Sequence, residues 1–224
     1  MSETLEEMAS FFDARCECYD KVHTAGIDGG AESKRVPALC LPPHTRTLLD
    51  LGVGTGLELE AVFTRFPDVR VTGLDISSHM LHKLLEKYPG RSIELHQVSY
   101  LDCDLGSARY DAALSVMSFH HYDHAVKRAL YRRIRRALKP GGVYVECDYM
   151  ISAHECPDPQ AVEDELFAAY RRIRRQQGLD DAREYHFDTP CTVANQIRLL
   201  RSAGFSQVRE VWRRKNTVLL TAAI

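Results

Sequence analysis

The sequence predicts one α/β domain with a mainly parallel sheet and helices on both faces. From residue 47 to residue 149, short apolar runs alternate with helical segments, which is the pattern of repeated βαβ units. Right-handed crossovers between parallel strands then place helices on both sides of the sheet. Only Lys215 and Asn216 separate the last two strand-like runs, and this spacing suits a tight hairpin. We therefore expect the last two strands to be antiparallel to each other.

Composition agrees with a globular protein and excludes several classes. Of the 224 residues, 45% are hydrophobic and 27% are charged, and the formal net charge of −2 argues against a polybasic arm or an acidic tail. No apolar run approaches the roughly 20 residues of a membrane span, and the acidic N-terminus lacks the apolar stretch of a signal peptide. The seven cysteines include no C-x-x-C pair, which favours reduced thiols over disulfides or zinc. We therefore expect a cytoplasmic protein without a bound metal.

Residues 1–46 are predicted to form a helical segment ahead of the sheet. Over residues 5–19, apolar side chains recur at helical spacing, namely Leu5, Met8, Phe11, Phe12 and Cys16. A glycine-rich break follows, and a second short helix is expected over residues 31–40, before Pro42 and Pro43.

The core follows as strands and helices in turn. Strands are expected at residues 47–53, 70–76, 92–98, 111–117 and 143–149. Helices are expected at 56–66, from the N-cap Ser77 to Pro89, and at 123–138, where Pro140-Gly141-Gly142 stops the helix. Further helices are expected near 162–177 and 192–203, and the hairpin would pair residues 207–214 with residues 217–224.

The first motif is Asp50-Leu51-Gly52-Val53-Gly54-Thr55-Gly56, between a strand and a helix. Its glycines allow a tight turn and the close approach of a ligand. A dinucleotide fingerprint would need a glycine where the chain has Leu57, so the pattern departs from a site built for pyrophosphate. S-adenosylmethionine (SAM) has no phosphate, and Asp50 could face its ammonium group, directly or through water.

The second feature is Asp75, at the end of the second predicted strand. An acid at that place can accept hydrogen bonds from both hydroxyls of a ribose. Together with the glycine loop, Asp75 indicates a nucleoside cofactor, and a NAD-binding oxidoreductase stays open as a distant alternative.

Five segments, in order, resemble the motif series of class I SAM-dependent methyltransferases. They are LLDLGVGTG, VTGLDIS, YDAALSVMSFHHY, LKPGGVYVECD and LRSAGFSQV, and they lie within residues 47–224. The resemblance implies a Rossmann-like sheet of seven strands in the order 3-2-1-4-5-7-6, with strand seven antiparallel. It also implies transfer of a methyl group from SAM, which leaves S-adenosylhomocysteine.

The same resemblance implies a set of cofactor-binding residues. The glycines Gly52, Gly54 and Gly56 would flank the methionine part of SAM, and Asp75 would hold the ribose. The residues expected near adenine are Ile76, Met80, Ser99 and Tyr100, and those expected beside the sulfonium are Ser115, Val116 and Met117. Many relatives have an aspartate where this chain has Tyr100, which puts the contact to the adenine amino group in doubt. The helix over 5–19 is similar to the segment that closes over SAM, so Tyr19 would lie near the methionine carboxylate or the sulfonium, or else pack at the helix end.

Two histidines follow the fourth predicted strand, where the family's acceptor binds. A neutral imidazole suits removal of a proton from an acceptor near neutral pH, so His120 or His121 is a candidate base. Both could instead pack or cap the helix that follows. Glu146 and Asp148 alternate with apolar residues near the end of the fifth strand, where they could orient an acceptor or lie solvated.

The acceptor itself is not given by the sequence. We expect a small molecule, bound between the lid of residues 1–46 and an insert over residues 150–190 within the domain of residues 47–224, in a monomer or homodimer. Basic residues on the helices near 123–139 and 162–177 leave RNA as a less favoured partner. The segment order is also loosely similar to that of carboxy-SAM synthase, an enzyme of tRNA modification. A SAM-binding module without activity is the alternative outside enzymes.

Overall fold

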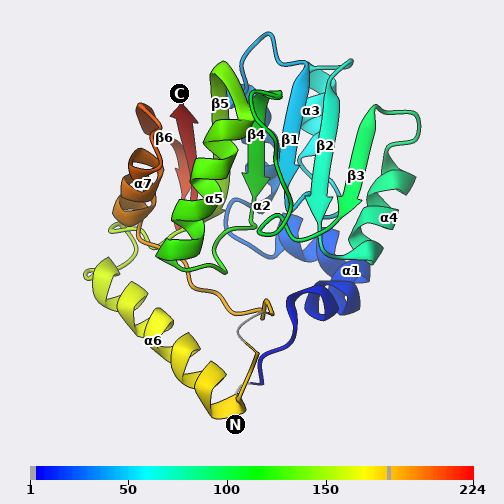
Figure 1. The fold of residues 1–224 in the computed structure, drawn as a ribbon. Coiled ribbons are helices and arrows are strands. Elements are labelled where there is room, and N and C mark those ends of the chain that lie inside the picture. The colour runs from blue at the N-terminus through cyan, green and yellow to red at the C-terminus, as the bar shows by residue number, and fades with distance from the viewer. Residues whose placement is uncertain (1–3, 181–182) are drawn as a thin grey trace.

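The computed structural model describes residues 4–180 and 183–224. Within them, seven strands form one sheet in the order β3-β2-β1-β4-β5-β7-β6 (Figure 1). The strands are β1 Thr47–Leu51, β2 Arg70–Asp75, β3 Ile93–Gln97, β4 Tyr110–Val116, β5 Leu138–Tyr149, β6 Gln207–Arg214 and β7 Thr217–Ala223. The first five are parallel, and β7 runs antiparallel to both β5 and β6. The predicted strand order and the predicted hairpin are confirmed.

Helices cover both faces of this sheet, also as predicted. They are α1 Met8–Ala25, α2 Gly30–Cys40, α3 Leu59–Arg65, α4 Ser78–Lys87, α5 His124–Ala137, α6 Pro159–Gln177 and α7 Val193–Ser202. One buried cluster packs α5 and α7 against the sheet, and a second packs α2, α3 and α4 against the other face. Among the described residues, none of the helices combines the length and the apolar character that a membrane span needs.

The helix starts follow from short polar side chains. Ser77 accepts a hydrogen bond from the backbone N–H of Met80, as its predicted N-cap role requires, and Asp123 and Thr192 cap α5 and α7 in the same way. The first helix differs from prediction, because it begins at Met8 and continues to Ala25. The residues before it are extended, since Glu7 forms an antiparallel bridge with Tyr185.

The prediction that Pro140-Gly141-Gly142 forms a turn ahead of the fifth strand is wrong. Helix α5 ends at Ala137 and β5 begins at Leu138, so these residues lie inside the strand. The register moves from Tyr110↔Leu138 to Ala112↔Val143, which is five residues along β5 for two along β4. The three extra residues form a bulge, and Gly141 supplies a positive φ of 76° there. A proline is tolerated because a bulge removes residues from the hydrogen-bonded ladder.

The N-terminal segment and the end of the insert meet at one edge of the sheet. This is the edge where the parallel strands end, below which α1 and α6 lie in Figure 1. The backbone N–H of Met8 donates to Glu184 O at 2.9 Å, and that of His186 donates to Glu6 O at 2.9 Å. Thr189 N–H donates to His120 O at 2.7 Å, which ties the insert to the loop after β4. Two segments distant in sequence therefore cover the edge where ligands bind in parallel α/β sheets.

Candidate functional site

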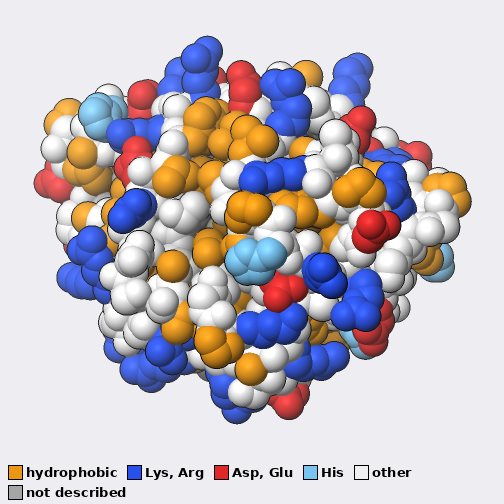
Figure 2. Space-filling view, turned by 90° about the horizontal axis from the view of Figure 1, so that it is seen from above, with side chains coloured by type: hydrophobic (Ala, Val, Ile, Leu, Met, Phe, Trp, Pro, Cys, Tyr) orange, Lys and Arg blue, Asp and Glu red, His pale blue; other side chains and the backbone are white. Residues whose placement is uncertain are grey.

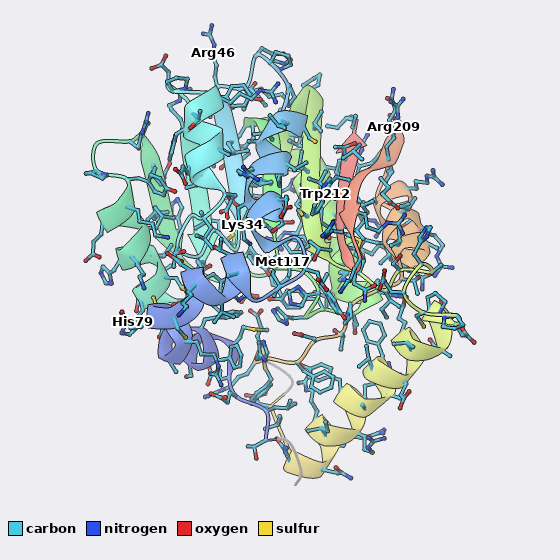
Figure 3. The ribbon with its side chains drawn as sticks, turned by 180° about the vertical axis from the view of Figure 1, so that it is seen from behind. Lys34, Arg46, His79, Met117, Arg209 and Trp212 are labelled. Atoms are coloured by element: carbon cyan, nitrogen blue, oxygen red, sulfur yellow. The ribbon has the colours of Figure 1, made fainter. Side chains whose placement is uncertain are left out.

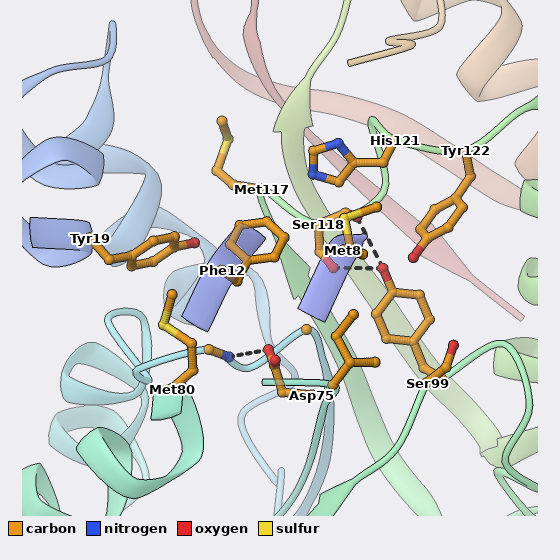
Figure 4. A pocket seen from close by; sticks show the side chains of 14 residues that line it. Met8, Phe12, Tyr19, Asp75, Met80, Ser99, Met117, Ser118, His121 and Tyr122 are labelled. Carbon is orange, nitrogen blue, oxygen red and sulfur yellow. Dashed lines mark hydrogen bonds between the residues drawn. The ribbon is translucent and has the colours of Figure 1, made fainter. Parts of the chain in front are cut away.

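A pocket of about 500 Å³, part of it open to solvent, lies between this edge of the sheet and α1 (Figure 4). Many of the predicted site residues line it, namely Tyr19, Gly52, Gly54, Asp75, Ile76, Met80, Ser99, Tyr100, Met117 and His121. Four further lining residues were not predicted, namely Met8, Phe12, Ser118 and Tyr122. The loops after four parallel strands thus face one helix across the pocket.

Asp75 organises the floor of the pocket. One carboxylate oxygen accepts from the backbone N–H of Gly54 at 2.9 Å, and the other accepts from that of Ser77 at 2.8 Å. Burial raises the pKa of Asp75 to about 6, against the lowering effect of these two hydrogen bonds. Each oxygen keeps a further lone pair, so the carboxylate can accept two more hydrogen bonds from a ligand.

The glycines of the loop have different surroundings. A Cβ on Gly52 would come within 2.0 Å of Ser118 Oγ, and its φ is 74°, so the turn requires glycine there. A Cβ on Gly54, which lines the pocket, would meet no atom within 4 Å. The backbone at Gly54 is therefore open to close approach by a ligand. Gly56 faces away from the pocket wall, toward Leu84 and Tyr88 of the α4 region.

Tyr100 is a buried lining residue of the pocket and follows β3. Its hydroxyl donates to Ser118 O at 3.0 Å and lies 2.9 Å from Ser118 Oγ (Figure 4). Ser99 Oγ accepts from the backbone N–H of Leu101 at 3.1 Å and thereby fixes the turn after β3. Burial is the main reason why the pKa of Tyr100 is raised, so the hydroxyl stays protonated.

Asp50 lies in the core, outside the pocket wall. It is fully buried, and neither carboxylate oxygen has a hydrogen-bond partner among the described residues. Burial and then the neighbouring charge of Glu58 raise its pKa well above the usual range. Lys34, which projects from α2 behind the sheet (Figure 3), is the buried cation that opposes this rise.

Two more predicted residues lie within the sheet. Ser115 is buried, and its hydroxyl lies 2.6 Å from the hydroxyl of Tyr144. Val116 is buried in the cluster that packs against α2, α3 and α4. Met117, the next residue, leaves the strand with a φ of 53° and reaches the pocket (Figure 3). A positive φ at a non-glycine residue is a strained conformation of a kind that clusters at functional sites.

Helix α1 is fastened over the pocket by two aspartates. Asp20 accepts from Thr55 Oγ1 at 2.5 Å and pairs with Lys87 Nζ at 2.5 Å, and Asp13 accepts from Ser77 Oγ at 2.5 Å. These contacts join the helix to the glycine loop and to α4. The acidic N-terminus noted in the sequence therefore holds the helix in place above the pocket.

A second, larger pocket of about 1200 Å³, including space open to solvent, continues from the first. It shares Phe12, Tyr19, Met117 and His121 with the first pocket. The rest of its wall is formed by Phe11, Arg15, Cys18, Val22, His23, Ile27, His120, Tyr149, His186 and Asp188. Most of the wall is apolar or aromatic, and the polar groups gather at the histidines.

His120 is held by a buried acid. Its Nδ1 lies 2.6 Å from Asp148 Oδ1, while the other oxygen of Asp148 accepts from Phe119 N–H at 2.7 Å. Burial opposes the charged imidazolium, but the attraction of Asp148 outweighs it and raises the pKa of His120. For His121, burial and then repulsion from His120 lower the pKa. Asp148 thus orients a histidine, whereas Glu146 bonds to Tyr131 and Gln196 on the side of α5 and α7.

The basic residues of α5 and its end mostly bond within the chain. Arg133 donates to two backbone carbonyls, Arg135 donates to Gly204 O, and Arg136 and Lys139 pair with Asp104 and Asp111. Lys127 is buried and donates to Gln196. On the face shown in Figure 2, Lys and Arg side chains are interspersed with Asp and Glu. The basic run of the sequence therefore serves largely to pack and fasten the helix.

The sheet order and the pocket at the end of its parallel strands define a Rossmann-like protein with a site for a nucleoside-containing cofactor. Comparison with known proteins makes this specific, since residues 48–142 match the family model of the methyltransferase domain. The chain is 30% identical over 151 residues to dTDP-4-amino-2,3,4,6-tetradeoxy-D-glucose N,N-dimethyltransferase of Saccharopolyspora spinosa, covering 65% of this chain and 59% of that protein.

Two other comparisons agree. Carboxy-S-adenosyl-L-methionine synthase of Trichodesmium erythraeum is 26% identical over 194 residues, covering 80% of this chain and 73% of that protein. The solved structure of human N-acetylserotonin methyltransferase in complex with SAM superimposes with a TM-score of 0.69 at 14% identity, covering 97% of this chain and 59% of that one. Residues 48–142 thus match a methyltransferase domain, and the chain resembles class I SAM-dependent methyltransferases. It spans less than two thirds of the aminosugar methyltransferase that it matches.

The pocket fits the family's cofactor, SAM. Asp75 has lone pairs free for the two ribose hydroxyls, and Gly54 presents open backbone, since a Cβ there would meet no protein atom within 4 Å. Ile76 and Met80 supply apolar surface for an adenine ring, and the aromatic face of Tyr19 suits a sulfonium.

Proposed function

We propose that the chain is a SAM-dependent methyltransferase whose acceptor is a small molecule bound in the second pocket. The observation that carries this proposal is the continuity of the two pockets. A site with the features of a SAM site opens, past Phe12, Tyr19 and Met117, into a mainly apolar chamber with histidines in its wall. A chamber of this kind suits a ligand with an apolar body and one polar group.

SAM, when bound, supplies an electrophilic methyl group on a sulfonium. The chain's own residues would do the positioning. Asp75 would hold the ribose, the backbone at Gly52 and Gly54 would lie along the methionine part, and Ile76, Met80, Ser99 and Tyr100 would surround the adenine. Three predicted residues would contribute indirectly, by shaping the turn and the strand that carry the pocket wall, namely Gly56, Ser115 and Val116. Asp50 lies buried below the loop and outside the pocket wall, so it would contact the ammonium group only through water.

On the acceptor side, the residues align the acceptor and exclude water. Helix α1 lines both pockets, and His186 and Asp188 line the second. Phe11 of α1 stacks on His186 with ring centroids 3.4 Å apart. Methyl transfer is an in-line displacement, so this alignment and water exclusion carry most of the catalysis. His121, whose lowered pKa keeps it neutral, or His120, which Asp148 orients, would receive the proton of an amine or hydroxyl acceptor.

The position of this site favours a small molecule over RNA. The chamber lies beneath α1 and the end of the insert, and the basic side chains of α5 largely bond within the chain. The test is calorimetry with SAM, S-adenosylhomocysteine and NAD, followed by incubation with methyl-labelled SAM and a metabolite extract. Binding of SAM with transfer of label to a metabolite is expected. Binding of NAD but not of SAM would contradict the proposal, and SAM binding without transfer would indicate a non-catalytic module.

A second candidate is supported by the match to carboxy-SAM synthase over 80% of the chain. That activity would add a carboxyl group, taken from a carboxylate-bearing second substrate in the extract, to the methyl carbon of SAM itself. Mass spectrometry of the recovered cofactor separates the two candidates, because a gain in the mass of SAM occurs only in the second.

A further inference from the structure

Four side chains in the wall of the second pocket meet at a single oxygen atom. They are His120, His121, His186 and Asp188, hereafter the histidine–aspartate cluster. Asp188 Oδ1 lies 3.2 Å from His121 Nδ1, 3.5 Å from His120 Nε2 and 3.8 Å from His186 Nε2. No local sequence pattern indicates this arrangement, because the two segments that form it are more than 60 residues apart.

The hydrogen bond at the far side of His120 fixes what its Nε2 can do. Asp148 accepts from the backbone N–H groups of Phe119 and Tyr149, so it is an acceptor toward His120 as well, and Nδ1 of His120 carries the hydrogen between them. In the neutral imidazole, Nε2 then presents its lone pair toward Asp188. A carboxylate that fixes a histidine in this way is the usual support of a metal-ligating histidine.

His121 supplies a second imidazole nitrogen, Nδ1, beside the same oxygen of Asp188. Its side chain is 4% exposed, and Nδ1 has no hydrogen-bond partner among the described residues although Asp188 Oδ1 is near. A buried polar atom without a partner costs free energy unless something fills the gap. Hydrogen bonds could join Asp188 to the imidazoles one at a time, each through that ring's own N–H, whereas a single cation would bind the imidazole nitrogens and the carboxylate together.

The spacing agrees with ligands around one ion. Metal–nitrogen and metal–oxygen bonds of about 2.0–2.2 Å place neighbouring ligand atoms roughly 3.0–3.5 Å apart in octahedral or tetrahedral geometry. The two shorter distances to Asp188 lie in this range. The ligand atoms of His120, His121 and Asp188 all lie within 4.8 Å of one another.

We propose that His120 Nε2, His121 Nδ1 and Asp188 bind a divalent first-row transition metal, with His186 as a fourth ligand. Imidazole nitrogens with one carboxylate suit Zn²⁺, Co²⁺ or Fe²⁺, whereas Mg²⁺ and Ca²⁺ prefer oxygen. The cluster faces the second pocket, so remaining coordination positions open toward the acceptor. This inference rests on the proposed function and narrows its acceptor class. The acceptor would carry an oxygen or nitrogen atom that coordinates the metal. The metal would then replace the two histidines as the group that activates the acceptor.

Metal binding is tested on the full chain without SAM or acceptor. The protein is stripped with a chelator and titrated with Co²⁺, followed by calorimetry and by the visible absorption of the bound ion, and the titration is repeated with Mg²⁺. One Co²⁺ per chain is expected, with much weaker binding of Mg²⁺. Asp188→Asn changes a side chain that is about half exposed, so the fold should persist, and it should weaken Co²⁺ binding at least 100-fold. Asp148→Asn, which alters only the support of His120, should weaken it by about 10- to 100-fold.

The matched control is His124→Gln. His124, Glu163 and Cys191 form the other group of described residues that could hold a metal, so this variant shows which cluster is occupied. Unchanged Co²⁺ binding in His124→Gln supports the proposal. No Co²⁺ binding by the native chain, or equal binding by Asp188→Asn, would overturn it. If the metal-free protein transfers methyl groups, and His120→Ala or His121→Ala lowers that rate, the proposed function stands and the metal site is wrong. If Co²⁺ binds as predicted but no methyl group is transferred, the metal site stands and the proposed function is wrong.

Discussion

Asp75→Asn tests the cofactor site with a nearly isosteric change. The wild-type carboxylate holds the loop through Gly54 and Ser77 and keeps lone pairs for two ribose hydroxyls. Hydrogen bonds to a charged group contribute about 1.5–3 kcal/mol each, and an asparagine oxygen retains part of this. We therefore expect a loss of roughly 2–3 kcal/mol, which raises the Kd for SAM roughly 30- to 150-fold.

The pH dependence gives an independent check of the same role. Because burial raises the pKa of Asp75 to about 6, the carboxylate that accepts from the ribose is present above pH 6 and is lost below it. At pH 5 about nine tenths of the side chain is protonated, so the wild-type Kd should be roughly tenfold higher than at pH 8. The Asn variant should show no such change over this range.

Isothermal titration calorimetry with SAM at several pH values measures both effects. Asp104→Asn, which removes an exposed acid paired with Arg136, is the matched control and should bind SAM normally. Circular dichroism shows whether each variant is folded. A folded Asp75→Asn variant with wild-type affinity would refute the assignment of Asp75 to the ribose.

Three other predictions follow from the same contacts. Asp20→Asn removes the ion pair with Lys87 that fastens α1, so stopped-flow dissociation of SAM should be several-fold faster, and an unchanged rate would mean that α1 does not close the pocket. Gly52→Ala places a Cβ against Ser118 at a positive φ, so thermal unfolding should show a loss of about 1–3 kcal/mol, and full stability would contradict this geometry. Burial raises the pKa of Glu146 from 4.5 in the unfolded chain to about 8 in the folded protein. Its contribution to the free energy of unfolding is therefore fully present below pH 4.5 and is lost as the pH rises through 8. Glu146→Gln should therefore gain on the order of 4 kcal/mol relative to wild type between pH 5 and pH 9 in urea unfolding, and parallel pH profiles would exclude this.

Much of the fold was predictable because its signals are local. Ser77 caps α4 through its own side chain, and the short link at Lys215 and Asn216 leaves room only for a hairpin. The prediction of a turn at Pro140-Gly141-Gly142 was wrong because it, too, used only a local signal. Proline and glycine report a local break in regular structure, but a bulge inside a strand and a turn before it give the same local pattern.

The site was predictable where its residues follow the ends of neighbouring parallel strands. The glycine loop and Asp75 stand next to strands whose ends are brought together by the parallel sheet. Phe12 looked like an ordinary apolar position of an amphipathic helix, and Asp188 like an acid in a polar insert. Their place in the pockets depends on the pairing of residues 6–8 with residues 184–186, a long-range contact that no local pattern indicates.

The central claim is that a SAM pocket opens into an acceptor chamber within one active site. The most direct measurement is the formation of S-adenosylhomocysteine, together with a labelled metabolite, when the protein is incubated with methyl-labelled SAM and a metabolite extract. The account predicts both products. It also predicts that a bulky substitution in the part of the wall that belongs to the second pocket alone, Ile27→Trp, leaves SAM binding within about threefold while transfer falls at least tenfold. Tight SAM binding with no labelled metabolite and no S-adenosylhomocysteine would contradict it.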